Sequence, residues 1–84
     1  MVNINPKIYG LQPNVKLKRV KGVVFVVINR KSRVIMKDGH RILKIVKKIK
    51  QIEINKSIGV LSSAPICSKT KEFLFQNDII IKTA

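Results

Sequence analysis

The chain of 84 residues is long enough for one domain with a modest hydrophobic core. Eighteen Lys and Arg residues against four Asp and Glu residues give a formal net charge of +14, and a compact domain so charged repels itself. The composition therefore predicts a polyanionic partner, with nucleic acid ahead of a membrane surface. The longest apolar run, residues 23–28, is far shorter than a membrane span, so we expect a soluble protein without a membrane partner.

Residues with catalytic or metal-binding chemistry are few. Cys67 is the only cysteine and His40 the only histidine, which excludes an internal disulfide and leaves too few ligands for a zinc site. A nucleophilic pair of Cys67 and His40 would lack an acid to orient it. No P-loop, paired carboxylate or serine-triad spacing is present. We therefore expect neither an enzyme nor a bound cofactor or metal.

The first fifteen residues carry Pro6, Gly10 and Pro13, a pattern that predicts an irregular N-terminal arm. Tyr9 is expected to pack over the edge of a β-barrel, and stacking on a base is the alternative. The arm has neither the composition of an organelle transit peptide nor the apolar core of a secretory signal. No cleavage is therefore expected.

Five β-strands are predicted after the arm. The first is rich in Val and Ile and is bent at Gly22, and the second ends at the turn signal Asp38-Gly39. Residues 40–54 have the apolar spacing of a helix, but their density of β-branched residues favours strands. The expected strands lie within residues 16–28, 32–37, 40–54, 57–63 and 72–81.

Short strands with turns about every ten residues and little helix predict an all-β fold. A small closed or half-closed barrel over residues 16–84 is the natural packing solution, because it leaves few free strand edges. Small barrels of this size commonly bind nucleic acid, although a fold alone does not determine function.

A basic loop is expected after Pro65. Ser68, Lys69, Thr70 and Lys71 alternate hydroxyl and ammonium groups, the side chains that most often contact nucleic-acid backbones, and a solvated loop with incidental lysines is the alternative. Thirteen of the eighteen basic residues lie within residues 16–50. Aromatic residues are scarce, so we expect recognition of the backbone and shape of a structured RNA.

The stretch Pro65-Ile66-Cys67-Ser68-Lys69-Thr70-Lys71-Glu72-Phe73 resembles the Arg-Pro-Leu-Ser-Lys-Thr-Lys-aromatic signature of the universal small-subunit ribosomal protein seventeen family. The Ser-Lys-Thr-Lys core is intact, while the arginine before the proline is absent and the proline is displaced by one position. Weaker similarities follow in the family's order, so the resemblance covers about residues 17–82. They are Gly22-Val23-Val24, Lys31-Ser32-Arg33-Val34-Ile35, His40 with Ile42, and Lys47-Lys48.

The resemblance implies a five-stranded oligonucleotide/oligosaccharide-binding (OB) barrel. Such a protein would bind small-subunit rRNA early in assembly and remain beside neighbouring ribosomal proteins as a structural constituent, with no small-molecule substrate. Divergence and the Lys- and Ile-rich composition imply a mitochondrial ribosome, with a plastid or bacterial ribosome as alternatives.

Two other interpretations stay open, a free-standing RNA-binding barrel such as a translation factor or RNA chaperone, and a basic subunit of an organelle membrane complex. The residues expected to contact rRNA are Lys31, Ser32, Arg33, His40, Arg41, Lys44, Lys47, Lys48, Lys50, Ser68, Lys69, Thr70 and Lys71.

Overall fold

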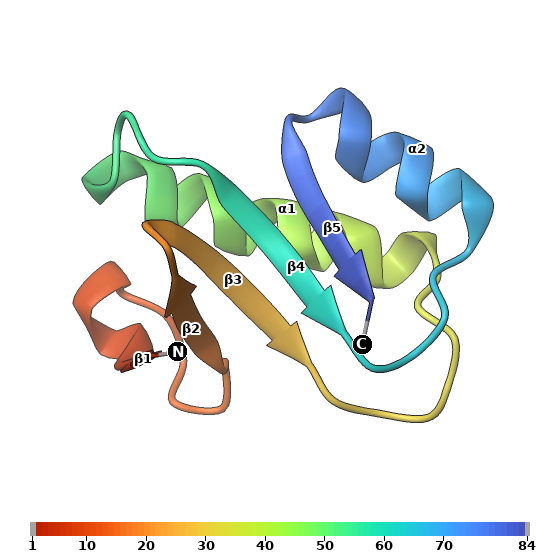
Figure 1. Cartoon of the computed structure of the whole chain (residues 1–84), viewed down its shortest axis with the longest axis horizontal. Helices are drawn as coiled ribbons and strands as arrows, with labels where there is room; N and C mark the ends of the chain where they lie inside the picture. The colour runs from red at the N-terminus through yellow and green to blue at the C-terminus, as the bar shows by residue number, and fades with distance from the viewer. Residues whose placement is uncertain (1, 84) are drawn as a thin grey trace.

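The computed structural model describes residues 2–83, which form an open five-stranded sheet with two α-helices (Figure 1). The strand order is β1-β2-β3-β4-β5; β1, β2 and β3 pair antiparallel, and β3, β4 and β5 pair parallel. The elements are β1 (Val2–Ile4), the 3₁₀ helix η1 (Pro6–Tyr9), β2 (Leu17–Val20), β3 (Val23–Ile28), α1 (Met36–Ile52), β4 (Ile58–Ser62), α2 (Ser68–Gln76) and β5 (Ile79–Thr83).

A β-rich fold with a five-stranded sheet is confirmed, but the expected all-β barrel is not found. The strand expected over residues 32–37 is wrong, because these residues form the loop after β3 and the start of α1. Within residues 2–83, β1 and β5 lie at opposite edges of the sheet and do not pair with each other. The physical reason is that β3, β4 and β5 run parallel, so each connection between them must cross over the sheet, and both crossings use a helix.

The predicted long first strand is a β-hairpin. Lys21 and Gly22 both have positive φ angles, 50° and 82°, which is the conformation of a two-residue hairpin turn. Gly22 therefore reverses the chain where we had expected a bend within one strand, and β2 pairs antiparallel with β3.

The segment for which we had favoured strands is the helix α1. Its buried apolar residues Ile42, Ile45, Val46 and Ile49 recur at helical spacing on one face. A β-branched residue costs a helix a few tenths of a kcal/mol, whereas burying such a side chain contributes roughly 1.5–3 kcal/mol. Packing on the sheet therefore outweighs the intrinsic preference for strand.

Both helices cover the same face of the sheet. Right-handed crossovers that proceed in one direction from β3 to β4 to β5 place α1 and α2 on one side, and α1 lies behind the strands in Figure 1. Val26, Val60 and Ile79 face the helices and join the buried residues of α1 in one core. On the other face the ring of Phe25 lies so close to Gly59 that a Cβ there would be 2.6 Å from it.

The predicted last strand is divided between α2 and β5. Asp78, with a φ angle of 59°, links the two elements. Phe73 and Phe75 would share one face of a strand, but on α2 they diverge. Phe73 is half-buried with its ring centroid 4.7 Å from that of His40, whereas Phe75 is 76% exposed.

The N-terminal segment is part of the fold and not an irregular arm. β1 pairs with β2, and Tyr9 is buried in the core. The Tyr9 hydroxyl donates a hydrogen bond to Glu53 Oε1 at 2.9 Å, and Arg19 Nη2 donates to the same oxygen at 2.8 Å. Tyr9 is therefore a packing residue, as expected, but it packs against the end of α1 and not against a barrel edge.

Candidate nucleic-acid interface

The exposed side of α1 carries a row of basic side chains. Its apolar residues face the sheet, so the lysines and arginine at the intervening positions project from the opposite side. From Lys37 to Lys48 the row extends about 16 Å along the helix axis, at 1.5 Å per residue. We call this set the α1 row: Lys37, Arg41, Lys44, Lys47 and Lys48, all of them exposed.

The α1 row has no carboxylate to neutralise it within the described chain. Among residues 2–83 the ion pairs are Arg19–Glu53 at 2.8 Å and Arg30–Asp38 at 2.5 Å. The basic side chains of the row therefore combine like charges at spacings of three and four residues, an arrangement that destabilises a helix unless an anion approaches it.

A second group of polar side chains lies where the parallel strands end. The loop after β3 and the loop after β4 are joined through Val34, whose backbone N–H donates to Pro65 O and whose carbonyl accepts from Cys67 N–H, both at 2.9 Å. The loop after β3 is thus held beside the first turn of α2. In open sheets with parallel strands, ligands bind at the carboxyl ends of the strands. We call these residues the carboxyl-edge group: Lys31, Ser32, Arg33, Ser68, Lys69 and Lys71, all exposed.

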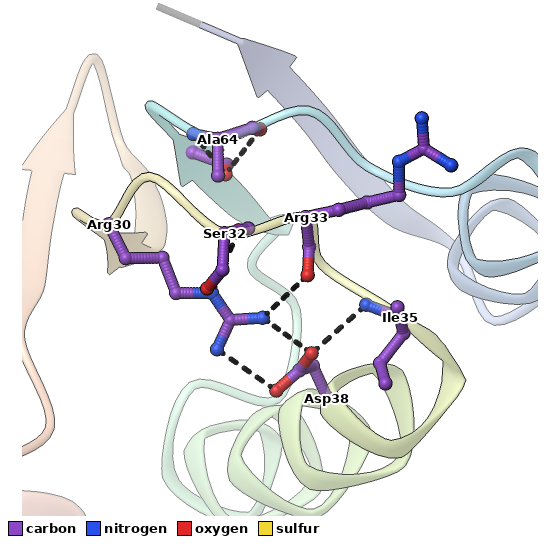
Figure 2. Close-up of polar contacts among 7 residues, drawn as sticks. Arg30, Ser32, Arg33, Ile35, Asp38 and Ala64 are labelled. Atoms are coloured by element: carbon purple, nitrogen blue, oxygen red, sulfur yellow. Dashed lines mark hydrogen bonds and ion pairs between the residues drawn. The ribbon is translucent and has the colours of Figure 1, made fainter.

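The loop after β3 is held in shape by Arg30 (Figure 2). The guanidinium donates two hydrogen bonds to the Asp38 carboxylate, at 3.1 and 2.5 Å, and others to the carbonyls of Ser32 and Arg33. The Asp38 carboxylate also accepts from Ile35 N–H at 3.0 Å, at the start of α1. In Figure 2 the Arg33 side chain extends away from this ion pair, so its charge is free to meet a ligand.

The same contacts explain the charge state of Asp38. The hydrogen bonds from Arg30, followed by the Ile35 N–H, hold the pKa of the Asp38 carboxyl below its ordinary value. The sequence alone did not indicate that Arg30 and Asp38 form an ion pair, because the pair links the loop after β3 to the first turn of a helix that had been assigned as strand.

The Ser-Lys-Thr-Lys segment is the first turn of α2 and not the loop that we had expected. Helical spacing turns Thr70 and Leu74 inward, and Thr70 is fully buried, so its predicted role as an exposed RNA contact is wrong. The backbone N–H groups of Lys69 and Thr70 hold the pKa of the Cys67 thiol below its ordinary value. The start of α2 is thus electrostatically favourable to negative charge.

His40 and Lys50, two more of the residues predicted to contact RNA, lie on α1. His40 is exposed and lies against Phe73 of α2, which brings the start of the α1 row close to the carboxyl-edge group. Lys50 is half-buried near the end of the helix. Lys37 was not predicted, because it had been assigned to the end of a strand; the helical spacing from Arg41 is the signal that would have found it.

Within residues 2–83 there is no cluster of three or more His, Cys, Asp or Glu residues that could hold a metal ion. None of the helices in this part of the chain has the length and apolar character needed to cross a membrane. No protein-family model, curated protein or solved structure matches the chain.

Proposed function

We propose that this protein binds folded RNA, with small-subunit rRNA as its target, and serves as a structural constituent of the small ribosomal subunit. The observation that carries the proposal is the α1 row, a set of exposed basic residues without ion-pair partners among residues 2–83. Phosphates held at fixed positions in a folded RNA would neutralise this row. The protein in turn would allow RNA segments to approach where their phosphates otherwise repel one another.

The proposed contacts are to phosphate and ribose and not to stacked bases. Of the four aromatic residues Tyr9, Phe25, Phe73 and Phe75, the first two are buried and the third is half-buried against His40. Single-strand binding modules present several exposed aromatic rings to successive bases. A row of cations on a rigid helix instead suits a structured RNA backbone.

The ribosomal part of the proposal has a narrower basis than the RNA-binding part. It rests on the resemblance of residues 65–73 to the family signature, in which Ser68, Lys69 and Lys71 are exposed at the start of α2. The OB barrel that the resemblance implies is not part of the proposal, because the sheet is open.

The RNA-binding surface is tested by removing two central charges of the row. We expect Lys44→Ala with Lys48→Ala to weaken binding to small-subunit rRNA. The slope of log Kd against log NaCl concentration should also fall by about 1.4–1.8, since each lost phosphate contact contributes about 0.7–0.9 to that slope. The measurement is a filter-binding or fluorescence titration over a range of NaCl concentrations.

The matched control is Lys7→Ala with Lys56→Ala, which removes the same charge from exposed lysines outside the row. Equal loss of affinity in both double variants would show that net charge alone drives binding and would overturn the assignment to α1.

The ribosomal assignment is tested by sedimentation of a lysate on a sucrose gradient, at low and then at moderate salt. We expect the protein to sediment with small-subunit rRNA and to stay there after the salt wash. Recovery at the top of the gradient with bound RNA would indicate a free-standing RNA-binding protein. Recovery with membranes would indicate a basic subunit of a membrane complex, and either result would contradict the ribosomal assignment.

A further inference from the structure

The sheet ends at β5, an edge strand that no other strand covers within residues 2–83. Among residues 2–83, β5 pairs with β4 alone, so the backbone groups along its other side have no strand partner (Figure 1). The strand begins with three consecutive isoleucines and contains no proline. Edge strands are normally shielded by charged side chains, prolines, bulges or a covering element, because an exposed edge pairs readily with another strand. Of these devices β5 carries the single lysine Lys82, which follows the three isoleucines.

Apolar surface gathers along the same edge. A hollow beside β5 is lined by Phe75, Gln76, Asp78, Ile79, Ile80 and Ile81. The side chain of Phe75 is 76% exposed, the largest fraction for any apolar residue here, and that of Ile80 is 39% exposed. An edge strand and an exposed aromatic ring next to it are the two features that strand addition uses, the first for backbone hydrogen bonds and the second for side-chain contact.

We propose that β5 pairs antiparallel with β5 of a second copy of this chain, across a twofold axis that passes between the two copies of Ile80. The two five-stranded sheets would then form one continuous sheet with all four α-helices on the same side. The interface would be isologous, as in most homodimers, because each copy contributes the same strand. This inference does not depend on the proposed RNA binding.

The register follows from the sequence of the strand. Residues opposite each other in a sheet share a face, so a continuous sheet restricts the possible registers to steps of two residues. With Ile80 opposite its own copy, Ile79 lies opposite Ile81, and Lys82 lies near Asp78, the turn residue that precedes the strand. A step of two in one direction would set Ile80 opposite Lys82, and a step in the other would set it opposite Asp78. The neighbouring registers place only one isoleucine opposite its own copy. The central register alone sets all three isoleucines opposite isoleucines and brings Lys82 near Asp78 of the second copy.

The charge distribution also favours this edge for self-association. Two of the four acidic residues, Glu72 and Asp78, belong to α2 and its link to β5, and neither takes part in an ion pair within the described chain. The other two are already paired with Arg30 and Arg19. Asp78 is thus available to a lysine of the second copy, and the contact between strands leaves the α1 row uncovered.

The register is tested by disulfide capture in a Cys67→Ser background, which removes the only native thiol. We expect Ile80→Cys to form a covalent dimer on mild oxidation with diamide, because directly opposite residues have Cα atoms about 4.5–5.5 Å apart, within the range of a disulfide. The control is Ile81→Cys, which faces Ile79 of the second copy. Equal capture of both, or of neither, would overturn the proposed register.

The dimer itself is tested by sedimentation equilibrium of the full chain. We expect self-association that strengthens as NaCl screens the repulsion between two chains of charge +14, the opposite of the salt response of RNA binding. Lys82→Glu should weaken association by facing Asp78 with a like charge, and adding Asp78→Lys should restore it. A chain that stays monomeric at high salt, or a double variant no better than the single one, would overturn the proposal even if RNA binding were established.

Discussion

At the scale of single residues, the Arg30–Asp38 ion pair determines how the loop after β3 is presented. Arg30 bridges two carbonyls of the loop and the Asp38 carboxylate, which also accepts from the N–H of Ile35, the residue before α1. Because most donors of the guanidinium are used, the loop has little freedom, and Arg33 is left to point outward. The exposed cations of the loop are thus positioned by a residue that is not itself part of the carboxyl-edge group.

We expect Asp38→Asn to destabilise the protein by about 1–2 kcal/mol at neutral pH, because it replaces a charge-assisted hydrogen bond by a neutral one. The pKa of Asp38 is lower in the folded protein than in the unfolded chain. The contribution of the Asp38 carboxylate to the unfolding free energy is therefore fully present above the ordinary carboxyl pKa of about 4. It is lost as the pH falls through the pKa of the folded protein.

The measurement is urea unfolding of both proteins from neutral pH down to acid. The difference in unfolding free energy should shrink on the acid side, and a difference that stays constant with pH would contradict the role of the charge. Glu72→Gln serves as the control, because Glu72 forms no ion pair within residues 2–83.

At the scale of elements, α1 shows how packing decides between two local preferences. Its sequence is dense in isoleucine, valine and lysine, and the isoleucines that face the sheet are the ones at helical spacing. Ile49 is fully buried, whereas Ile52, three residues later, is 56% exposed at the end of the helix. The same residue type on one helix is therefore fully buried at one position and exposed at another.

This contrast gives a matched pair of substitutions. We expect Ile49→Ala to cost about 2–5 kcal/mol of unfolding free energy, the usual cost of a large cavity in a core. Ile52→Ala should change it by about 0.5 kcal/mol or less, as for most surface positions. Chemical denaturation followed by circular dichroism measures both, and similar losses for the two variants would contradict the helical register.

At the scale of the whole molecule, the charge of +14 is carried on a small domain in which two ion pairs occupy half of the acidic residues. Self-repulsion lowers the stability of the compact state, and a polyanion relieves it. The proposed RNA binding would therefore be coupled to stability through the same charges.

We expect the thermal midpoint of the free protein to rise with NaCl, because screening reduces the repulsion within the folded chain. Calorimetry or a dye-based melt measures the effect. The variant Lys44→Gln with Lys48→Gln should melt higher at low salt and respond less to NaCl. A midpoint that falls with salt in both proteins would show that the two ion pairs outweigh the repulsion.

The sequence by itself determined the features that depend on composition and on local chemistry. The charge balance predicts a polyanionic partner, and Val and Ile correctly marked residues 58–62 as a strand. The turn signal at Asp38-Gly39 was wrong, because both residues lie in the first turns of α1. The scarcity of aromatic residues pointed to recognition of a backbone. These inferences need only the identity of a residue and its near neighbours, so they require no knowledge of the fold.

Only the tertiary structure decided the direction of the strands and the nature of residues 36–52. The apolar residues of α1 fit both a helix and strands, and the choice depends on a sheet face that other segments build. The burial of Thr70 follows from the same cause, since its orientation is fixed by a helix that packs beside β5 and α1. Contacts between residues distant in the chain contribute more free energy than local preference does, and those contacts exist only once the sheet has formed.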